Sequence, residues 1–276
     1  MEFIEIIKSI LLGIVEGITE WLPISSTGHM ILLDEFVKLN VSDEFRSLFL
    51  VVIQLGAIIA VPVYFFKRLN PFVKTESGYI DKSIMRLWGK VIVGVVPAAV
   101  LGLLLDDLLD AYLFNYIVVA IALVAYGIVF IVVEKLKGEK PDRVKTVDEL
   151  TYRDALTIGA FQVLSLVPGT SRSGSTILGG MLTGVSRTAS AEFSFFMAIP
   201  VMLGASGLKV LKFILSGFDA TSGEVILLLV GIVVSFLVSL AVIKFLMDFV
   251  KRHSFAPFGV YRIILGAAVL SYFLIK

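Results

Sequence analysis

Long runs of apolar residues, separated by short charged segments, dominate the pattern of this chain. Six of these runs are close to the roughly 20 residues that a helix needs to cross a bilayer. Their few charges lie mostly near the ends, where long basic side chains can reach the membrane surface. Arg262 lies about two turns inside the last run. The pattern predicts membrane-spanning helices over 47–66, 87–105, 111–133, 193–215, 225–243 and 255–275.

Two further apolar stretches, 3–37 and 155–182, are interrupted near their middle. The first contains Leu22-Pro23-Ile24-Ser25-Ser26-Thr27-Gly28, and the second contains Val167-Pro168-Gly169-Thr170-Ser171-Arg172-Ser173-Gly174. The arms are too short to span a bilayer, and irregular backbone at that depth needs protein or a water-filled cavity around it. We therefore predict two re-entrant helical hairpins. The alternative for each stretch is a single kinked span.

The two interrupted stretches resemble each other, which indicates an internal repeat. Leu22-Pro23 matches Val167-Pro168, and Ser25-Ser26 matches Thr170-Ser171; this register sets Glu16 and Glu20 opposite Phe161 and Ser165. Each half then holds one hairpin and three spans, so the second half is inverted relative to the first. The prediction is an all-α integral membrane protein forming one domain. Repeat one covers about 1–135, a linker covers about 136–152, and repeat two covers about 153–276.

The charges of the loops predict which side faces the cytoplasm. The segments 67–86 and 134–154 are rich in lysine and arginine, whereas 34–46, 106–110 and 216–224 carry nine acids, among them Asp219, against Lys38 and Arg46. Lysine and arginine mark the cytoplasmic side. Both chain termini are therefore expected on the outer face.

The composition of the chain excludes several classes of function. The chain is 58% hydrophobic with a mean hydropathy of +0.96, and 17% of its residues are charged. A soluble domain carries about 25% charged residues. The net charge of +1 supplies no field for nucleic acid, and the absence of cysteine excludes disulfides, thiolate metal sites and cysteine nucleophiles.

Two carboxylates in the first interrupted stretch point to chemistry at membrane depth. Glu16 and Glu20 are four residues apart, so they share a helix face, where two like charges repel. A divalent cation, a shared proton or a water-filled cavity would explain them, and hard cations prefer oxygen ligands. The alternative is a solvated acidic face without a role.

The two interruptions place hydroxyls where new helices begin. Ser25, Ser26 and Thr27 in the first, with Gly28 removing bulk, and Thr170, Ser171 and Ser173 in the second are suited to cap helices or to surround phosphate. His29 follows as a candidate base, acid or metal ligand. The alternative is that the hydroxyls only cap helices and that His29 is a core residue.

Arg172 lies at the second interruption, where a guanidinium needs an anionic partner. Its fork suits phosphate oxygens, although an ion pair with Glu16 or Glu20 is the alternative. Gln54, in the middle of a span, is a candidate donor at the site or between helices. Together these residues favour phosphoryl chemistry on a substrate with a lipid tail.

Both motifs resemble the signatures of one family. The segment from Glu16 to His29, Glu-Gly-Ile-Thr-Glu-Trp-Leu-Pro-Ile-Ser-Ser-Thr-Gly-His, and the segment from Pro168 to Gly174 look like the two signatures of the undecaprenyl-diphosphate phosphatases, also called bacitracin resistance proteins. The resemblance covers essentially the whole chain. It implies hydrolysis of undecaprenyl diphosphate to undecaprenyl phosphate and inorganic phosphate, which recycles the lipid carrier for cell-wall synthesis and confers bacitracin resistance.

The resemblance also implies roles for individual residues. Glu16, Glu20, His29 and Arg172 are the expected essential residues, with Ser26 as nucleophile, and Mg²⁺ or Ca²⁺ is the expected cofactor, held by Glu16 and Glu20. Attack by His29 or by water stays an alternative. A bacterial inner-membrane location follows, with the active site open to the outer face; the oligomeric state is open, and a homodimer is one alternative. A transporter or flippase for a phosphorylated polyprenyl lipid is the competing function, because inverted repeats with broken helices also build transporters.

Overall fold

The computed structural model describes residues 3–74, 78–113, 115–138, 140–217 and 220–275. Within these ranges the secondary structure is mainly helical, and Val144 and Val185 form an isolated β-bridge. The predicted all-α class is confirmed. The α-helices of the described residues are α1 (Phe3–Thr19), α2 (Ser26–Phe36), α3 (Asp43–Tyr64), α4 (Phe66–Leu69), α5 (Lys82–Leu113), α6 (Tyr116–Lys137), α7 (Tyr152–Val163), α8 (Arg172–Leu182), α9 (Arg187–Leu215), α10 (Ser222–Val250) and α11 (Ala256–Ile275).

Six of these helices, α3, α5, α6, α9, α10 and α11, are long and apolar enough to cross a membrane. They coincide with the six predicted spans, with one difference at the third. The loop expected at 106–110 is helical, because α5 continues to Leu113 and α6 begins only at Tyr116. Asn115 sets that boundary, since its side chain accepts a hydrogen bond from Val118 N at 3.0 Å and caps α6. Asp219 lies outside the described residues.

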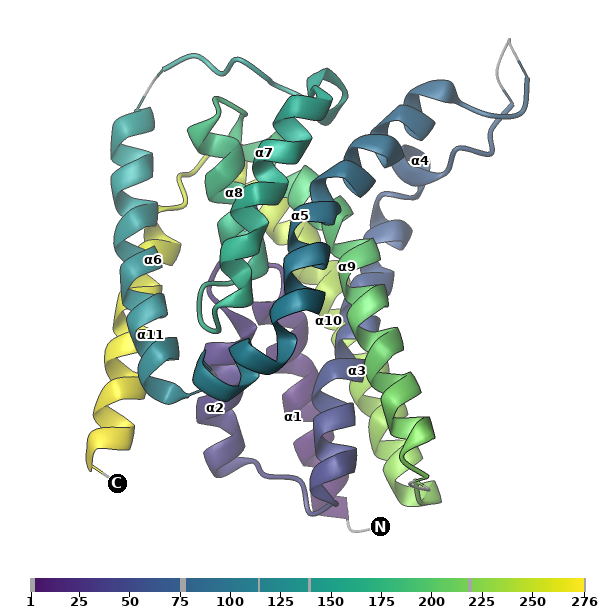
Figure 1. Cartoon of the computed structure of the whole chain (residues 1–276), viewed down its shortest axis with the longest axis vertical. Coiled ribbons are helices and arrows are strands. Elements are labelled where there is room, and N and C mark those ends of the chain that lie inside the picture. Colours follow the sequence, from purple (N-terminus) through teal and green to yellow (C-terminus); the bar gives the residue numbers. More distant parts are fainter. Residues whose placement is uncertain (1–2, 75–77, 114, 139, 218–219, 276) are drawn as a thin grey trace.

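The two interrupted stretches form helix pairs that turn back on themselves. Figure 1 shows α1 and α2 at the end of the molecule where the chain begins, and α7 and α8 at the opposite end. Their connections approach each other near the middle of the bundle, and both ends of the chain lie at the same end of the molecule. Re-entry of the two hairpins from opposite membrane faces stays a prediction.

The helices of the two halves pack reciprocally. α1 lies along α10 and α7 along α5, while α3 contacts α9 and α6 contacts α11. This exchange is the arrangement that an inverted repeat produces when each hairpin packs against a span of the other half. The backbones of α6 and α11 approach each other closely at Gly127 and Gly259. A side-chain carbon added at either glycine would lie 2.6 Å from the carbonyl oxygen of the other.

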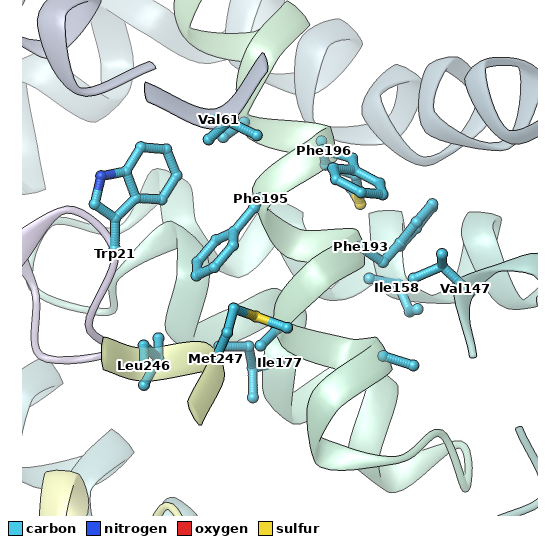
Figure 2. Packing of buried hydrophobic residues seen from close by; sticks show 14 of the residues in the cluster. Trp21, Val61, Val147, Ile158, Ile177, Phe193, Phe195, Phe196, Leu246 and Met247 are labelled. Atoms are coloured by element: carbon cyan, nitrogen blue, oxygen red, sulfur yellow. The ribbon is translucent and has the colours of Figure 1, made fainter. Parts of the chain in front are cut away.

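The main apolar core lies directly beside the interruption of the first hairpin. Figure 2 shows Trp21 and the phenylalanines of α9 around a common interior. Trp21 is fully buried and meets Phe195 edge to face, with ring centroids 5.0 Å apart. Because aromatic pairs of this kind are rigid and well packed, they fix the end of the first hairpin against α9.

Candidate active site

The two interruptions end in the same kind of helix cap. Ser25 accepts a hydrogen bond from Gly28 N at 3.4 Å, and Ser171 accepts one from Gly174 N at 3.2 Å. Both serines have positive φ, 71° and 72°, which are the only such values outside glycine in the described chain. This backbone region is strained for residues with a side chain and is concentrated at functional sites.

These caps correct the register of the repeat predicted from sequence. Ser25 corresponds to Ser171, so Ser26 corresponds to Arg172 rather than to Ser171. Upstream of the prolines nothing changes the predicted register, in which Glu16 lies opposite Phe161. The physical reason for the shift at the caps is an additional residue, since two positions separate Pro23 from its cap, whereas three separate Pro168 from the equivalent cap. Matching residue letters around the prolines hid this insertion.

The carboxylate of Glu20 connects the first residues of the two capped helices. Ser26 Oγ donates to Glu20 Oε2 at 3.1 Å, and Arg172 Nη2 donates to Glu20 Oε1 at 2.7 Å. The side chains of Glu20 and Arg172 are about one-tenth exposed. The structure therefore brings together the predicted nucleophile Ser26, the predicted essential carboxylate Glu20 and the predicted anion-binding residue Arg172.

Arg172 is held on several sides and keeps one free donor. Its Nη1 donates to Ser194 O at 3.0 Å, and its guanidinium lies 5.6 Å from the ring centroid of Trp21. Among the described residues, Arg172 Nε and Trp21 Nε1 are buried and have no hydrogen-bond partner. Buried N–H groups without partners are costly, so these two are candidate donors for an anion. Trp21 and Ser194 were not identified from sequence as site residues.

The other hydroxyls mainly hold the interruptions together. Ser173 Oγ lies 3.3 Å from Glu20 O and 3.4 Å from Leu22 O, which ties the second hairpin to the first. Thr170 Oγ1 donates to Val167 O at 2.7 Å within its own turn. A side-chain carbon at Gly28 would lie 2.9 Å from Cδ1 of Leu123, so a larger residue there would need the end of that leucine side chain to shift.

All of the predicted contacts with phosphate stay predictions, including those of Ser171, Thr27 and Gln54. Ser171 Oγ is 3.1 Å from Ser173 Oγ and also caps α8. Thr27 is partly exposed beside Ser26. Gln54 is partly buried in α3, and no contact described for this chain connects its side chain to the interruptions.

His29 is engaged by groups other than Ser26 and Glu20. Its Nδ1 lies 2.8 Å from Ser25 O, and its Nε2 lies 2.7 Å from the hydroxyl of Tyr261 on α11. The rings of His29 and Tyr261 are stacked, with centroids 5.6 Å apart and an interplanar angle of 8°. The ring nitrogens of His29 are thus bonded to groups other than the predicted nucleophile.

Glu16 has a carboxylate oxygen that accepts no hydrogen bond from the described residues. Its residue is 1% exposed, and its Oε1 is buried without a partner among the described residues. Such an atom calls for a cation, a proton or water. Both oxygens of Glu20, by contrast, are occupied by Ser26 and Arg172. In the described part of the chain, no cluster of three or more potential metal ligands occurs.

Arg262 is the structural residue that sequence reasoning missed. It is fully buried, and its two Nη groups donate to Pro23 O at 3.1 Å and to Gly169 O at 2.8 Å, one carbonyl in each interruption. Its guanidinium lies 5.6 Å from the centroid of the Tyr126 ring, and its Nε is buried without a hydrogen-bond partner among the described residues. Its position inside an apolar span was the available signal, because a charge there marks a functional or structural site.

Fold and site together define a polytopic helical membrane protein with an acid, a hydroxyl and a guanidinium joined at the meeting point of two hairpins. A family model described as bacitracin resistance protein BacA matches residues 9–268. The chain belongs to this family.

Curated relatives match over nearly their whole length. An undecaprenyl-diphosphatase of Enterococcus faecalis is 56% identical, with 98% of each chain covered. An undecaprenyl-diphosphatase of Desulfitobacterium hafniense is 55% identical, covering 99% of this chain and 98% of the relative. Undecaprenyl-diphosphatase 1 of Clostridioides difficile is 57% identical, covering 98% of this chain and 97% of the relative.

Proposed function

We propose that this membrane protein hydrolyses undecaprenyl diphosphate to undecaprenyl phosphate and inorganic phosphate, which recycles the lipid carrier for cell-wall synthesis and confers bacitracin resistance. The single observation that carries the proposal is the carboxylate of Glu20, which accepts from Ser26 and from Arg172 at once. A nucleophile within hydrogen-bond reach of a base, beside a fixed cation, is what phosphoryl transfer requires. The identity of the substrate is inferred from the relatives, which are named undecaprenyl-diphosphatase.

The proposed reaction has two steps. Ser26 Oγ attacks the terminal phosphorus while its proton passes to Glu20, and the bond from that phosphorus to the bridging oxygen breaks, so undecaprenyl phosphate leaves. Water then attacks the phosphorus of the phosphoserine, the bond from phosphorus to Ser26 Oγ breaks, and Glu20 returns its proton to Oγ, so inorganic phosphate leaves and the serine hydroxyl is restored. His29, which shares a face of α2 with Ser26, is the proposed proton acceptor for the water.

In this proposal Arg172 pairs with Glu20 before the substrate binds and with the phosphate oxygens of the substrate during the reaction. Its pairing with Glu20 neutralises a carboxylate that would otherwise repel the diphosphate. The phosphate oxygens then compete for the guanidinium, whose fork suits them. Once Arg172 moves from Glu20 Oε1 to the substrate, the carboxylate of Glu20 no longer shares its charge with the guanidinium and takes the proton of Ser26. The N-termini of α2 and α8 add backbone donors and positive dipole ends.

We also propose a divalent cation, Mg²⁺ or Ca²⁺, as cofactor. Glu16 fits this role because its Oε1 is buried and unpartnered, whereas Glu20 would contribute only after Arg172 has left it. Magnesium is commonly bound by one or two carboxylates together with substrate phosphates, so the donors suit a cation that arrives with the diphosphate. When bound, it would neutralise charge on the phosphates.

We propose the bacterial cytoplasmic membrane as the location, with both termini and the opening of the site on the outer face. The support is the distribution of lysine and arginine over the loops. In Figure 1 the basic segments around α4 and between α6 and α7 lie at the end opposite the chain termini.

The competing function is transport or flipping of a phosphorylated polyprenyl lipid, and the reciprocal packing of the two halves is the observation that favours it. Phosphate release from a prenyl diphosphate by purified protein in detergent separates the two, because micelles hold no gradient and no second leaflet. We expect multiple turnovers by the wild type and loss of release in Ser26→Ala. Absence of release by folded wild-type protein supplied with Mg²⁺ and with Ca²⁺ would overturn the hydrolase proposal.

A further inference from the structure

We infer that Tyr261 is the positioning residue of His29, holding the imidazole in one tautomer with Nε2 as its proton-accepting nitrogen. The catalytic part of this inference rests on the proposed hydrolase function, whereas the tautomer itself does not. The observation behind it is that both ring nitrogens of His29 have a partner, Ser25 O at 2.8 Å and the Tyr261 hydroxyl at 2.7 Å.

The chemistry of the two partners assigns the proton. A backbone carbonyl can only accept, so Nδ1 must carry the hydrogen that it donates to Ser25 O. In the neutral ring Nε2 is then unprotonated, and it accepts a hydrogen bond from Tyr261. A tyrosine hydroxyl both donates and accepts. In the neutral ring the hydroxyl occupies the single lone pair of Nε2, so it turns away when Nε2 takes a proton from water and then accepts from the protonated nitrogen. The same contact thus serves both states of His29.

The surroundings make Tyr261 a fixed reference for the imidazole. Its ring is nearly parallel to that of His29, and a half-turn of the imidazole would lose both of its hydrogen bonds. The next residue along α11, Arg262, is anchored to the carbonyls of Pro23 and Gly169. Ser25, the partner of Nδ1, is the helix cap at the first interruption. The two groups that orient His29 are thus both tied to the backbone that carries Ser26.

Tyr261→Phe removes only the hydroxyl and keeps the stacked ring. We expect kcat to fall by about ten- to a hundredfold, because a general acid or base in the wrong tautomer loses much of its contribution, while KM changes by less than about threefold, because Tyr261 makes no contact proposed for substrate. Tyr272→Phe is the matched control, since Tyr272 lies on the same helix and its ring packs against Phe36 of α2 with centroids 5.5 Å apart. This control is expected to keep the wild-type kcat.

The spectroscopic test uses the fact that the chain has two histidines, His29 and His253. In a His253→Gln background, protein labelled with ¹⁵N-histidine in detergent micelles gives the nitrogen resonances of His29 alone. We expect a protonated Nδ1 and an unprotonated, hydrogen-bonded Nε2 in the parent. Tyr261→Phe should move the Nε2 resonance and introduce the second tautomer, and Tyr272→Phe should leave the spectrum unchanged.

Each outcome decides a separate question. A parent spectrum with an unprotonated Nδ1 at neutral ring charge overturns the tautomer. An unchanged Nε2 resonance and an unchanged kcat in Tyr261→Phe overturn the positioning role. If the wild type releases no phosphate, the proposed function fails, and the nitrogen spectra still decide between the tautomers.

Discussion

Arg172 Nη2 donates to Glu20 Oε1 at 2.7 Å, and this ion pair joins the second hairpin to the first. The other oxygen of the same carboxylate accepts from Ser26. Because Ser26 and Arg172 are the first residues of α2 and α8, equivalent positions of the two halves carry different side chains. A site with one hydroxyl and one cation thus arises from a repeated backbone.

Arg172→Lys should reduce phosphate release by about a hundredfold or more while the protein still folds. Lysine keeps the charge and can pair with Glu20, but it lacks the planar fork that binds two phosphate oxygens. Initial rates on a prenyl diphosphate and thermal unfolding in detergent measure the two effects. Arg252→Lys, at an exposed position after α10, is the control. Near-normal turnover in Arg172→Lys would show that a point charge suffices.

Substitution of Arg262 should affect stability and activity together. Arg262→Lys cannot serve the carbonyls of Pro23 and Gly169 with one rigid fork, and each buried carbonyl left unpaired costs about 1–3 kcal/mol. We expect a lower unfolding temperature and a lower rate for this variant. Arg262→Met also leaves both carbonyls unpaired, but it removes a buried charge whose desolvation is itself costly. This variant should therefore lose activity while losing less stability than Arg262→Lys. Full activity of Arg262→Met would contradict the role of Arg262 in joining the interruptions.

The two acids should respond differently to metal. Chelator should abolish phosphate release, and Mg²⁺ or Ca²⁺ should restore it. Glu16→Gln should shift the metal titration to higher concentration, so that added metal recovers part of the rate. Glu20→Gln should lower the maximal rate even at saturating metal, because Glu20 holds Ser26 and Arg172. Full activity of both variants in excess chelator would exclude the metal and favour a shared proton.

The orientation can be measured with single cysteines, since the chain has none. Asp43→Cys, at an N-terminal position of α3 whose side chain is 90% exposed, should react with an impermeant thiol reagent in intact cells. Lys140→Cys, in the basic segment after α6, should react only after permeabilisation. Both sites are exposed, so a difference reports the side of the membrane and not burial. The reverse pattern would place the site opening in the cytoplasm.

The sequence by itself determined the spans and the kinds of residue at the site. The free energy of transferring a segment into lipid is nearly a sum over its own residues. Six spans can therefore be predicted from hydropathy along the chain. The exception is the boundary between α5 and α6, where the cap at Asn115, and not hydropathy, decides where α6 begins. Glu16, Glu20 and Arg172 were identifiable because charges at membrane depth need a reason.

Only the tertiary structure decided how these residues are paired. The register that sets Ser26 opposite Arg172 depends on backbone geometry at the caps, Ser25 and Ser171, and not on matching residue letters. The contacts of Tyr261 with His29 and of Arg262 with both interruptions join segments more than 90 residues apart. No local pattern encodes such contacts, because they exist only when α11 packs against α2 and α6 and the two hairpins meet.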